Sequence, residues 1–180
     1  SVAVLHDGRC LSDYQVIPRL HAQRLLPMIQ HLLSEAGLSL SQLDGIAFGR
    51  GPGAFTGVRI AIGVVQGLAF ALQRPVLPVS NLAALAQRAW REQGATQVAS
   101  AIDARMDEVY WGCYRLEQGE MRACQEEAVL PPEAVRLPMG EASEWFAAGT
   151  GWGSHAARLP QVPRQQADLL PHALDILQLA

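Results

Sequence analysis

The sequence contains no lysine, and all fourteen of its basic residues are arginine. A phosphate-binding P-loop, Schiff-base catalysis and a Ser-Lys dyad each depend on a lysine side chain. The absence of lysine therefore excludes these three kinds of site from the chain.

Cysteine is also scarce. Cys10, Cys113 and Cys124 form neither a CxxC motif nor a cluster with histidine. Because a secreted disulfide framework uses an even number of cysteines, this odd and scattered set predicts a reducing environment and a cytoplasmic protein. The net charge of −3, from 17 acidic and 14 basic residues, argues against a highly basic nucleic-acid-binding domain.

Long apolar runs are missing too. The longest candidate, residues 60–72, is interrupted by Gln66 and is shorter than the roughly 20 residues that cross a bilayer. We therefore expect no membrane association.

Apolar residues are nevertheless abundant, since 49% of the 180 residues are hydrophobic and only 17% are charged. A chain of this size can bury roughly 70% of the surface that its unfolded form exposes, as one large domain or two small halves. Disorder is therefore excluded as its main state.

The hydrophobic pattern predicts an alternation of strands and helices. A hairpin turning at Asp7 and Gly8 is followed by a helix that Gly37 ends, and Pro27 should kink this helix or mark its true first turn. We expect strands at 1–6, 9–17, 45–48, 76–79, 97–102, 108–116, 121–129 and 145–148, and helices at 20–36, 56–73, 81–93 and 167–180.

This order of elements suggests two copies of one α/β unit, the second of them reduced. A duplicated unit of this kind is the layout of the actin-like ATPase (ribonuclease H-like) fold, so we predict that α/β fold. The expected N-terminal subdomain is residues 1–95, and the expected C-terminal subdomain is residues 96–180.

A glycine-rich segment, Gly49–Gly57, joins a predicted strand to a predicted helix. Glycines allow close backbone approach, and a helix N-terminus offers unpaired N–H groups to an anion, so the segment could bind phosphate. The alternative is a tight turn in which Thr56 caps the helix. The sequence leaves both interpretations open.

The same segment resembles the signature of the bacterial TsaB (YeaZ) family. The resemblance rests on GRGPGAFTGVRI at 49–60 with GLA at 67–69, and extends to RLLP at 24–27, AIDARM at 101–106, VYW at 109–111 and GTGW at 149–152. Members of that family are actin-like-fold proteins of tRNA threonylcarbamoyladenosine biosynthesis that partner the catalytic paralogue TsaD. The family's opening strand, with its phosphate loop, is absent before Ser1, and the chain stops before the usual C-terminus, so we expect a chain truncated at both ends.

The resemblance also implies the absence of catalysis. TsaD-like enzymes carry a HxxxH metal pair on the helix after the strand equivalent to 76–79, where this chain has Asn81 and Leu85. A leucine cannot bind a metal ion. We therefore expect no catalytic residue, no metal site and no tightly bound cofactor, and leave open ATP or ADP at a partner interface.

Other polar residues are expected to be structural. Asp103, Asp107 and Glu108 are predicted to lie at a hairpin turn, Cys113 to pack in a sheet, and the five histidines to lie on the surface or in packing. The remaining candidates for a phosphate or nucleotide loop are Gly51, Gly53, Thr56, Gly57, Asp103, Arg105, Gly149, Thr150 and Gly151.

The helix predicted at 56–73 is apolar all round and must be covered on two sides. Small residues at four-residue steps, Gly63, Gly67 and Ala71, permit the close approach of a second helix. The helix at 20–36 could cover it, or a partner could. The expected partner interface is Leu25, Leu26, Ile29, Leu32, Leu33, Ile60, Gly63, Val64, Gly67, Leu68 and Ala71.

Together these features predict a non-catalytic subunit that binds and activates TsaD in threonylcarbamoyl transfer to the adenosine beside the anticodon of ANN-decoding tRNAs. The resemblance implies TsaD and TsaE as partners, a homodimer through the same helices, and indirect contact with tRNA. The alternatives are a nucleotide-dependent phosphotransferase of the sugar-kinase branch, a glycoprotease-like peptidase, and a homodimeric interaction protein unrelated to tRNA.

Overall fold

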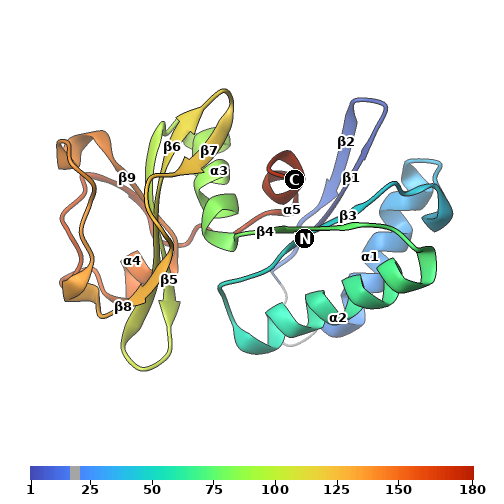
Figure 1. The fold of residues 1–180 in the computed structure, drawn as a ribbon, viewed down its shortest axis with the longest axis horizontal. Coiled ribbons are helices and arrows are strands. Elements are labelled where there is room, and N and C mark those ends of the chain that lie inside the picture. Colours follow the sequence, from blue (N-terminus) through green and yellow to red (C-terminus); the bar gives the residue numbers. More distant parts are fainter. Residues whose placement is uncertain (17–20) are drawn as a thin grey trace. The chain divides into compact units, whose positions relative to one another are not determined.

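The computed structural model describes residues 1–16 and 21–180, which fall into two units (Figure 1). The first unit comprises Ser1–Arg50, Ala54–Val79 and His172–Ala180. The second comprises Gly51–Gly53 and Ser80–Pro171. This division differs from the predicted subdomains 1–95 and 96–180, because residues 51–53 and 80–95 lie in the second unit and residues 172–180 lie in the first.

The first unit combines two pairs of strands with three helices. Its antiparallel hairpin turns at Asp7 and Gly8, both of which have positive φ angles, as predicted. The second pair is parallel. The elements are β1 (Val2–His6), β2 (Arg9–Asp13), α1 (His21–Glu35), η1 (Leu40–Gln42), β3 (Ile46–Gly49), α2 (Phe55–Leu72), β4 (Val76–Val79) and α5 (Ala173–Gln178).

Helix α1 forms the core of the first unit with the hairpin. Leu32 and Leu33 are buried together with Val4 of β1, which explains the helical spacing of the apolar residues. Pro27 lies inside α1 and is not its first turn. Gly37 follows the helix with a φ of +70°, and its N–H donates to the Ser34 carbonyl, as expected of a glycine that ends a helix. The predicted strand over 9–17 is too long, because β2 ends at Asp13. The predicted helix start at residue 20 lies outside the described residues.

The second unit is built on a mixed sheet of order β10-β9-β5-β6-β7, in which β8 also pairs with β6. The predicted meander is confirmed, but its third strand is divided by residues 124–127 into β7 and β8. The strands are β5 (Gln97–Ala104), β6 (Glu108–Glu117), β7 (Glu120–Ala123), β8 (Ala128–Leu130), β9 (Phe146–Ala148) and β10 (Arg164–Gln166).

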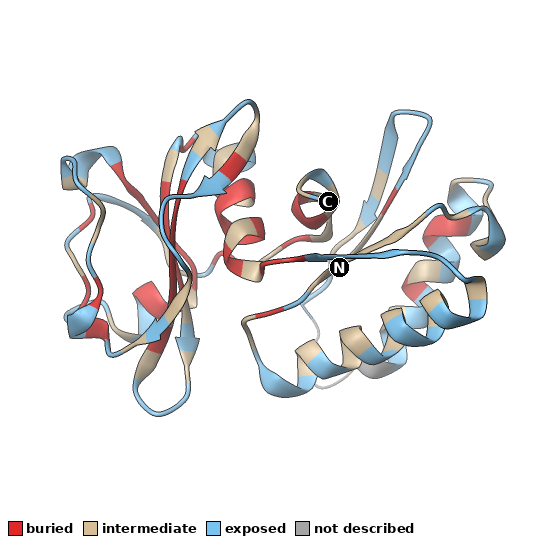
Figure 2. Ribbon diagram, in the orientation of Figure 1, coloured by how far each residue is buried: buried red, intermediate tan, exposed pale blue. Residues whose placement is uncertain are grey.

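Helix α3 (Asn81–Gln93) covers one face of this sheet and is buried along its inner side (Figure 2). Leu82, Leu85 and Ala89 pack against β5, β6 and β7. The Ser80 hydroxyl accepts hydrogen bonds from the N–H groups of Leu82 and Ala83, which confirms the predicted cap. Because α3 buries its apolar side in the second unit, the structure corrects the predicted assignment of residues 80–95 to the N-terminal subdomain.

The opposite face of the sheet packs against loops, a short helix α4 (Thr150–Ser154), and the 3-10 turns η2 (Pro132–Ala134) and η3 (Ala142–Glu144). Three tryptophans dominate this second core: Trp111, Trp145 and Trp152. The indole N–H of Trp152 donates to the Ala99 carbonyl over 2.9 Å. This bond ties α4 to β5.

The prediction of a long C-terminal helix over 167–180 is wrong. Residues 164–166 form β10, and only Ala173–Gln178 is helical. Pro171 interrupts the pattern because the residue before a proline is disfavoured in a helix. His172 then caps α5, since its ring Nδ1 accepts the Leu174 N–H over 3.0 Å.

Helix α2 has 18 residues and, by length and composition alone, could cross a membrane. Among the described residues, no other helix is long and apolar enough to do so. The test is weak evidence, because helices of soluble proteins pass it too. None of the α2 residues is buried in the first unit.

Candidate functional sites

The two parts of the glycine-rich segment belong to different units. Gly51 and Gly53 fall in the second unit, whereas Thr56 and Gly57 form the first turn of α2 in the first. Within the second unit, the Asn81 N–H donates to the Gly51 carbonyl over 2.8 Å, and the Asn81 side-chain amide donates to the Pro52 carbonyl over 3.0 Å. The segment 51–53 therefore binds the start of α3 through its own carbonyl oxygens.

The alternative in which Thr56 caps α2 is wrong. The residue at the N-cap position of α2 is Ala54, and no side chain accepts a hydrogen bond there. Thr56 is instead an exposed residue inside the helix. The phosphate-binding interpretation of Thr56 and Gly57 stays a prediction.

The structure brings Asp103 next to Gly149, Thr150 and Gly151. The Asp103 N–H donates to the Thr150 hydroxyl over 3.1 Å. Gly149 has a φ of +105°, and a side chain there would overlap the Ala101 carbonyl oxygen. A Cβ at Gly151 would lie 2.9 Å from the Cβ of Ala101. These glycines are therefore required for packing against β5, whatever else they do.

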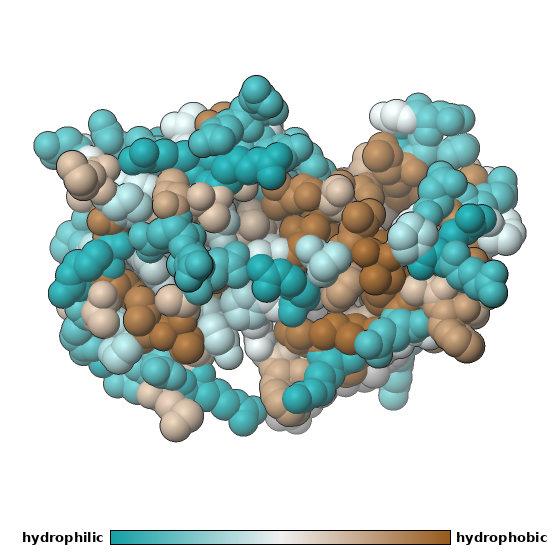
Figure 3. Space-filling model, in the orientation of Figure 1, coloured by the Kyte–Doolittle hydropathy of each residue, from teal (hydrophilic) through white to brown (hydrophobic). Residues whose placement is uncertain are grey.

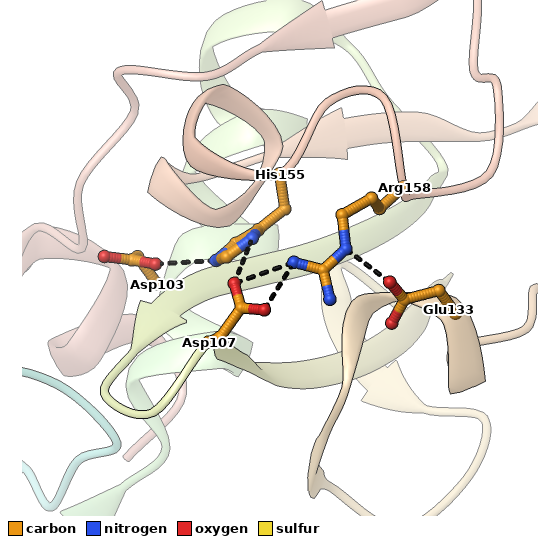
Figure 4. A network of polar contacts seen from close by, with 5 residues as sticks. All are labelled: Asp103, Asp107, Glu133, His155 and Arg158. Carbon is orange, nitrogen blue, oxygen red and sulfur yellow. Dashed lines mark hydrogen bonds and ion pairs between the residues drawn. The ribbon is translucent and has the colours of Figure 1, made fainter.

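Five ionisable side chains form a network on the second unit: Asp103, Asp107, Glu133, His155 and Arg158 (Figure 4). The Nε2 of His155 lies 2.9 Å from an Asp103 carboxylate oxygen, and its Nδ1 lies 3.6 Å from Asp107. Arg158 donates to both Asp107 oxygens over 2.7 Å and also bonds Glu133. The network therefore ties the β5–β6 turn to the segment after α4 and to η2.

Asp107 lies in the β5–β6 turn, as predicted, whereas Asp103 is the next-to-last residue of β5, opposite Val109 of β6. Their common contact with His155 was not predicted. The His155 side chain is only 9% exposed and bridges two carboxylates, so its role is more specific than the predicted one. Met106 and Asp107, at the turn itself, both have positive φ angles. Asp107 is held in this conformation by Arg158 and His155.

Charge pairing shifts the pKa values of two groups of the network, Glu133 and Arg158. The hydrogen bond from Arg158, followed by one from the Glu133 main chain, lowers the pKa of the Glu133 carboxyl below its usual 4.5. The bond to Glu133, followed by that to Asp107, raises the pKa of Arg158. The charged forms of both groups are therefore favoured in the folded state.

This pairing predicts an acid-sensitive contribution to stability. Because folding lowers the pKa of Glu133, its contribution is present above pH 4.5 and is lost as the pH falls through the folded-state value. We expect Arg158→Gln to reduce the fall in melting temperature on acidification below pH 4.5, measured by circular dichroism. Arg136→Gln is the matched control, since Arg136 bonds main-chain carbonyls of Glu133 and Val135. An unchanged acid profile in Arg158→Gln would contradict the assignment.

Asn81 and Leu85 of α3 and Cys113 of β6 all have structural contacts in the second unit. Leu85 is fully buried in the core of the second unit, and Asn81 is engaged with segment 51–53. Cys113 is also fully buried, and burial, followed by the proximity of Cys124, raises its pKa to about 12. Among the described residues, no group of three His, Cys, Asp or Glu side chains is arranged to hold a metal ion.

The helices of the predicted partner interface, α1 and α2, contact each other in the first unit. Ile60, Val64 and Leu68 are half-buried, whereas Gly63, Gly67 and Ala71 are exposed. A Cβ at Gly63 or Gly67 would have no neighbouring atom within 4 Å. Apolar side chains gather along α2 and β4 on the face in Figure 3. Among the described residues of the first unit, no atom therefore lies close to the small-residue side of α2.

The structure corrects the prediction that Leu32 and Leu33 belong to the partner interface. Leu32 and Leu33 are 2% and 4% exposed and pack against Val4, so their side chains are not available to a partner. Leu25 and Ile29 are half-buried, and Leu26 is 46% exposed. Of the α1 residues in the predicted interface, those accessible to a partner thus lie in the part of the helix before Leu32.

A family model described as TsaD, tRNA N6-adenosine threonylcarbamoyltransferase, matches residues 15–176. The tRNA threonylcarbamoyladenosine biosynthesis protein TsaB of Escherichia coli K12 is 47% identical over the whole chain, which covers 80% of that protein. The chain belongs to the TsaB (YeaZ) family. The TsaB of Haemophilus influenzae is 40% identical over the whole chain, which covers 79% of that protein.

Solved structures agree with this membership in the TsaB family. YeaZ from Pseudomonas aeruginosa has a TM-score of 0.94 and 71% identity, over 98% of this chain and 83% of that one. A second structure, described as an uncharacterized protein with similarity to peptidase YEAZ from Pseudomonas aeruginosa, has a TM-score of 0.95 and 70% identity, over 98% of this chain and 82% of that one. The predicted α/β fold of the actin-like family is confirmed.

Proposed function

We propose that this chain is a non-catalytic subunit for threonylcarbamoyl transfer to the adenosine beside the anticodon of ANN-decoding tRNAs, and that it binds and activates a TsaD transferase. Membership in the TsaB family supports the pathway, because relatives are named for threonylcarbamoyladenosine biosynthesis. The chain's own contribution is a docking surface for the transferase.

The observation that carries the proposal is the uncovered α2 helix. A helix that is apolar on all sides is normally buried, yet α2 has no buried residue in the first unit. The half-buried Ile60, Val64 and Leu68 flank a side where Gly63 and Gly67 leave open space. A helix of a TsaD partner that packs there would cover the apolar side chains and use the glycines for close approach.

Residue chemistry favours a scaffold over the phosphotransferase and peptidase alternatives. Leu85 is buried in an apolar core where a metal ligand would be needed, and Asn81 bonds the Pro52 carbonyl. A phosphotransferase would need a catalytic carboxylate, and Asp103, the carboxylate among the candidate nucleotide-loop residues, is paired with His155. We therefore assign catalysis to the partner.

The same proposal places TsaE as a further partner and a homodimer on the same α1–α2 surface, in competition with TsaD. Contact with tRNA is indirect, and ATP or ADP, where present, lies at the partner interface and not tightly bound to this chain. We place the protein in the cytoplasm, and we assign the apolar face of α2 to a protein partner instead of a membrane.

The proposal is tested by depletion and complementation. We expect cells depleted of this protein to contain ANN-decoding tRNAs without threonylcarbamoyladenosine, and the restored full-length protein to co-purify with TsaD, both measured by mass spectrometry. Fully modified tRNAs after depletion would overturn the pathway, and would favour an interaction protein unrelated to tRNA. Micromolar binding of ATP and Mg²⁺ by the isolated protein in calorimetry would favour the phosphotransferase.

A further inference from the structure

Two of the three cysteines lie opposite each other in the sheet of the second unit. In the antiparallel β6–β7 pair, Tyr114 is opposite Ala123, so the next pair along is Cys113 and Cys124. The Cys124 N–H donates to the Cys113 carbonyl over 2.8 Å, which continues the hydrogen-bonding pattern beyond the end of β7. The two residues therefore face each other across the strands.

Directly opposite residues of an antiparallel pair project to the same face of the sheet. The Cα atoms of such a hydrogen-bonded pair are about 5.5 Å apart. A disulfide spans Cα separations of about 4.4 to 6.8 Å. The backbone at 113 and 124 is thus already spaced for a disulfide, and both residues are free thiols in this structure.

The two thiols differ in access to solvent. Cys124 is exposed and lies at the end of an edge strand, where it can meet a solvent oxidant. Cys113 is buried beside it, in the core that contains Trp111. The proximity of Cys124 contributes to the raised pKa of Cys113, which agrees with the pairing that the strand register shows.

We propose that Cys113 and Cys124 are an oxidation site, at which a peroxide converts the two thiols into an intramolecular disulfide. The Cys124 thiolate attacks hydrogen peroxide, the S–O bond forms as the O–O bond breaks, and the hydroxide that leaves takes up a proton to become water. The Cys113 sulfur attacks the resulting sulfenic acid, and its proton passes to the hydroxide that leaves Cys124. The S–S bond forms as the S–O bond breaks, and a second water leaves.

The balance of this reaction is two thiols and one peroxide to one disulfide and two waters, so the sulfurs supply both electrons. The product would link β6 to the segment that follows β7 and fix their register. Cys10 provides an internal comparison, because its opposite residue in the β1–β2 hairpin is Leu5. No cysteine is paired with it.

Peptide mapping tests the proposal on the folded full-length protein. After treatment with hydrogen peroxide, free thiols are alkylated and the chain is cut with trypsin, which cleaves here at arginine only. The cysteines then lie in separate peptides, 106–115 and 123–136. We expect these two peptides to be linked, with the loss of two hydrogens, at least about tenfold more than any pair that contains Cys10.

Two variants and one condition complete the test. Cys124→Ser should lose the linked peptides, whereas Cys10→Ser should keep them, and unfolding in guanidinium before oxidation should lower their yield. Oxidation of Cys124 to a sulfinic acid with Cys113 still alkylated would overturn the proposal. So would loss of the linked peptides in Cys10→Ser, or a yield that unfolding leaves unchanged.

Discussion

Replacing Gly67 with leucine should weaken association with TsaD by about a hundredfold, because a bulky side chain keeps the partner helix from its close approach. The isolated protein should fold normally. Position 67 is exposed, a Cβ there meets no atom within 4 Å, and leucine favours a helix over glycine by about 1 kcal/mol. The affinity is measured by calorimetry or biolayer interferometry with purified TsaD.

Gln66→Leu is the matched control for this variant. It introduces the same side chain at an exposed position on the same helix, one residue away and about 100° around the axis. We expect it to bind TsaD like the wild type and to restore tRNA modification in depleted cells, whereas Gly67→Leu does neither. Wild-type affinity of Gly67→Leu would show that the small-residue side of α2 is not the interface.

Gly149→Ala should destabilise the second unit by about 3 kcal/mol, since it combines a backbone conformation that only glycine tolerates with an overlap against a main-chain oxygen. Gly149 has a φ of +105° and a ψ of 169°, and its α-carbon faces the Ala101 carbonyl of β5. In a chain of this size, such a loss lowers the melting temperature by about 10 °C. Thermal unfolding followed by circular dichroism measures it.

Gly153→Ala tests the same substitution four residues away, where a Cβ would lie 3.5 Å from the Cβ of Ala167, an ordinary contact. Its stability should stay within about 0.5 kcal/mol of the wild type. Wild-type stability of Gly149→Ala would mean that packing does not require this glycine. The conformation of the loop would then call for another explanation, such as a bound ligand.

Local signals in the sequence predicted most of the first unit and α3. The turn at Asp7 and Gly8, the helix end at Gly37 and the cap at Ser80 each depend on a few neighbouring residues. The apolar periodicity of α1 also identified the residues that pack on the hairpin. The periodicity could not separate the α1 residues that are buried within the first unit from those left for a partner, because both sets have the same spacing. Which residues are buried depends on contacts with Val4, which is far away in the sequence.

What the sequence could not show is how distant segments combine. His155 meets Asp103 and Asp107 across about fifty residues, with no local motif that links them. The extent of α5 was missed for a different reason. Its amphipathic pattern extends back through residues 167–172, but Pro171 and the His172 cap delay the helix until residue 173. The assignment of α3 to the second unit likewise depends on its packing against distant strands, which the sequence of the helix does not reveal.

The first unit draws on three separate stretches of the chain, and its last one, His172–Ala180, is translated only after the whole second unit. Helix α5 contacts both β1 and β3, and its Ala173 N–H donates to the Ser1 hydroxyl. During synthesis, the earlier stretches of the first unit therefore stay incomplete, with apolar surface uncovered, until residues 172–180 have been made. Chaperone binding to the nascent chain should be concentrated in that interval.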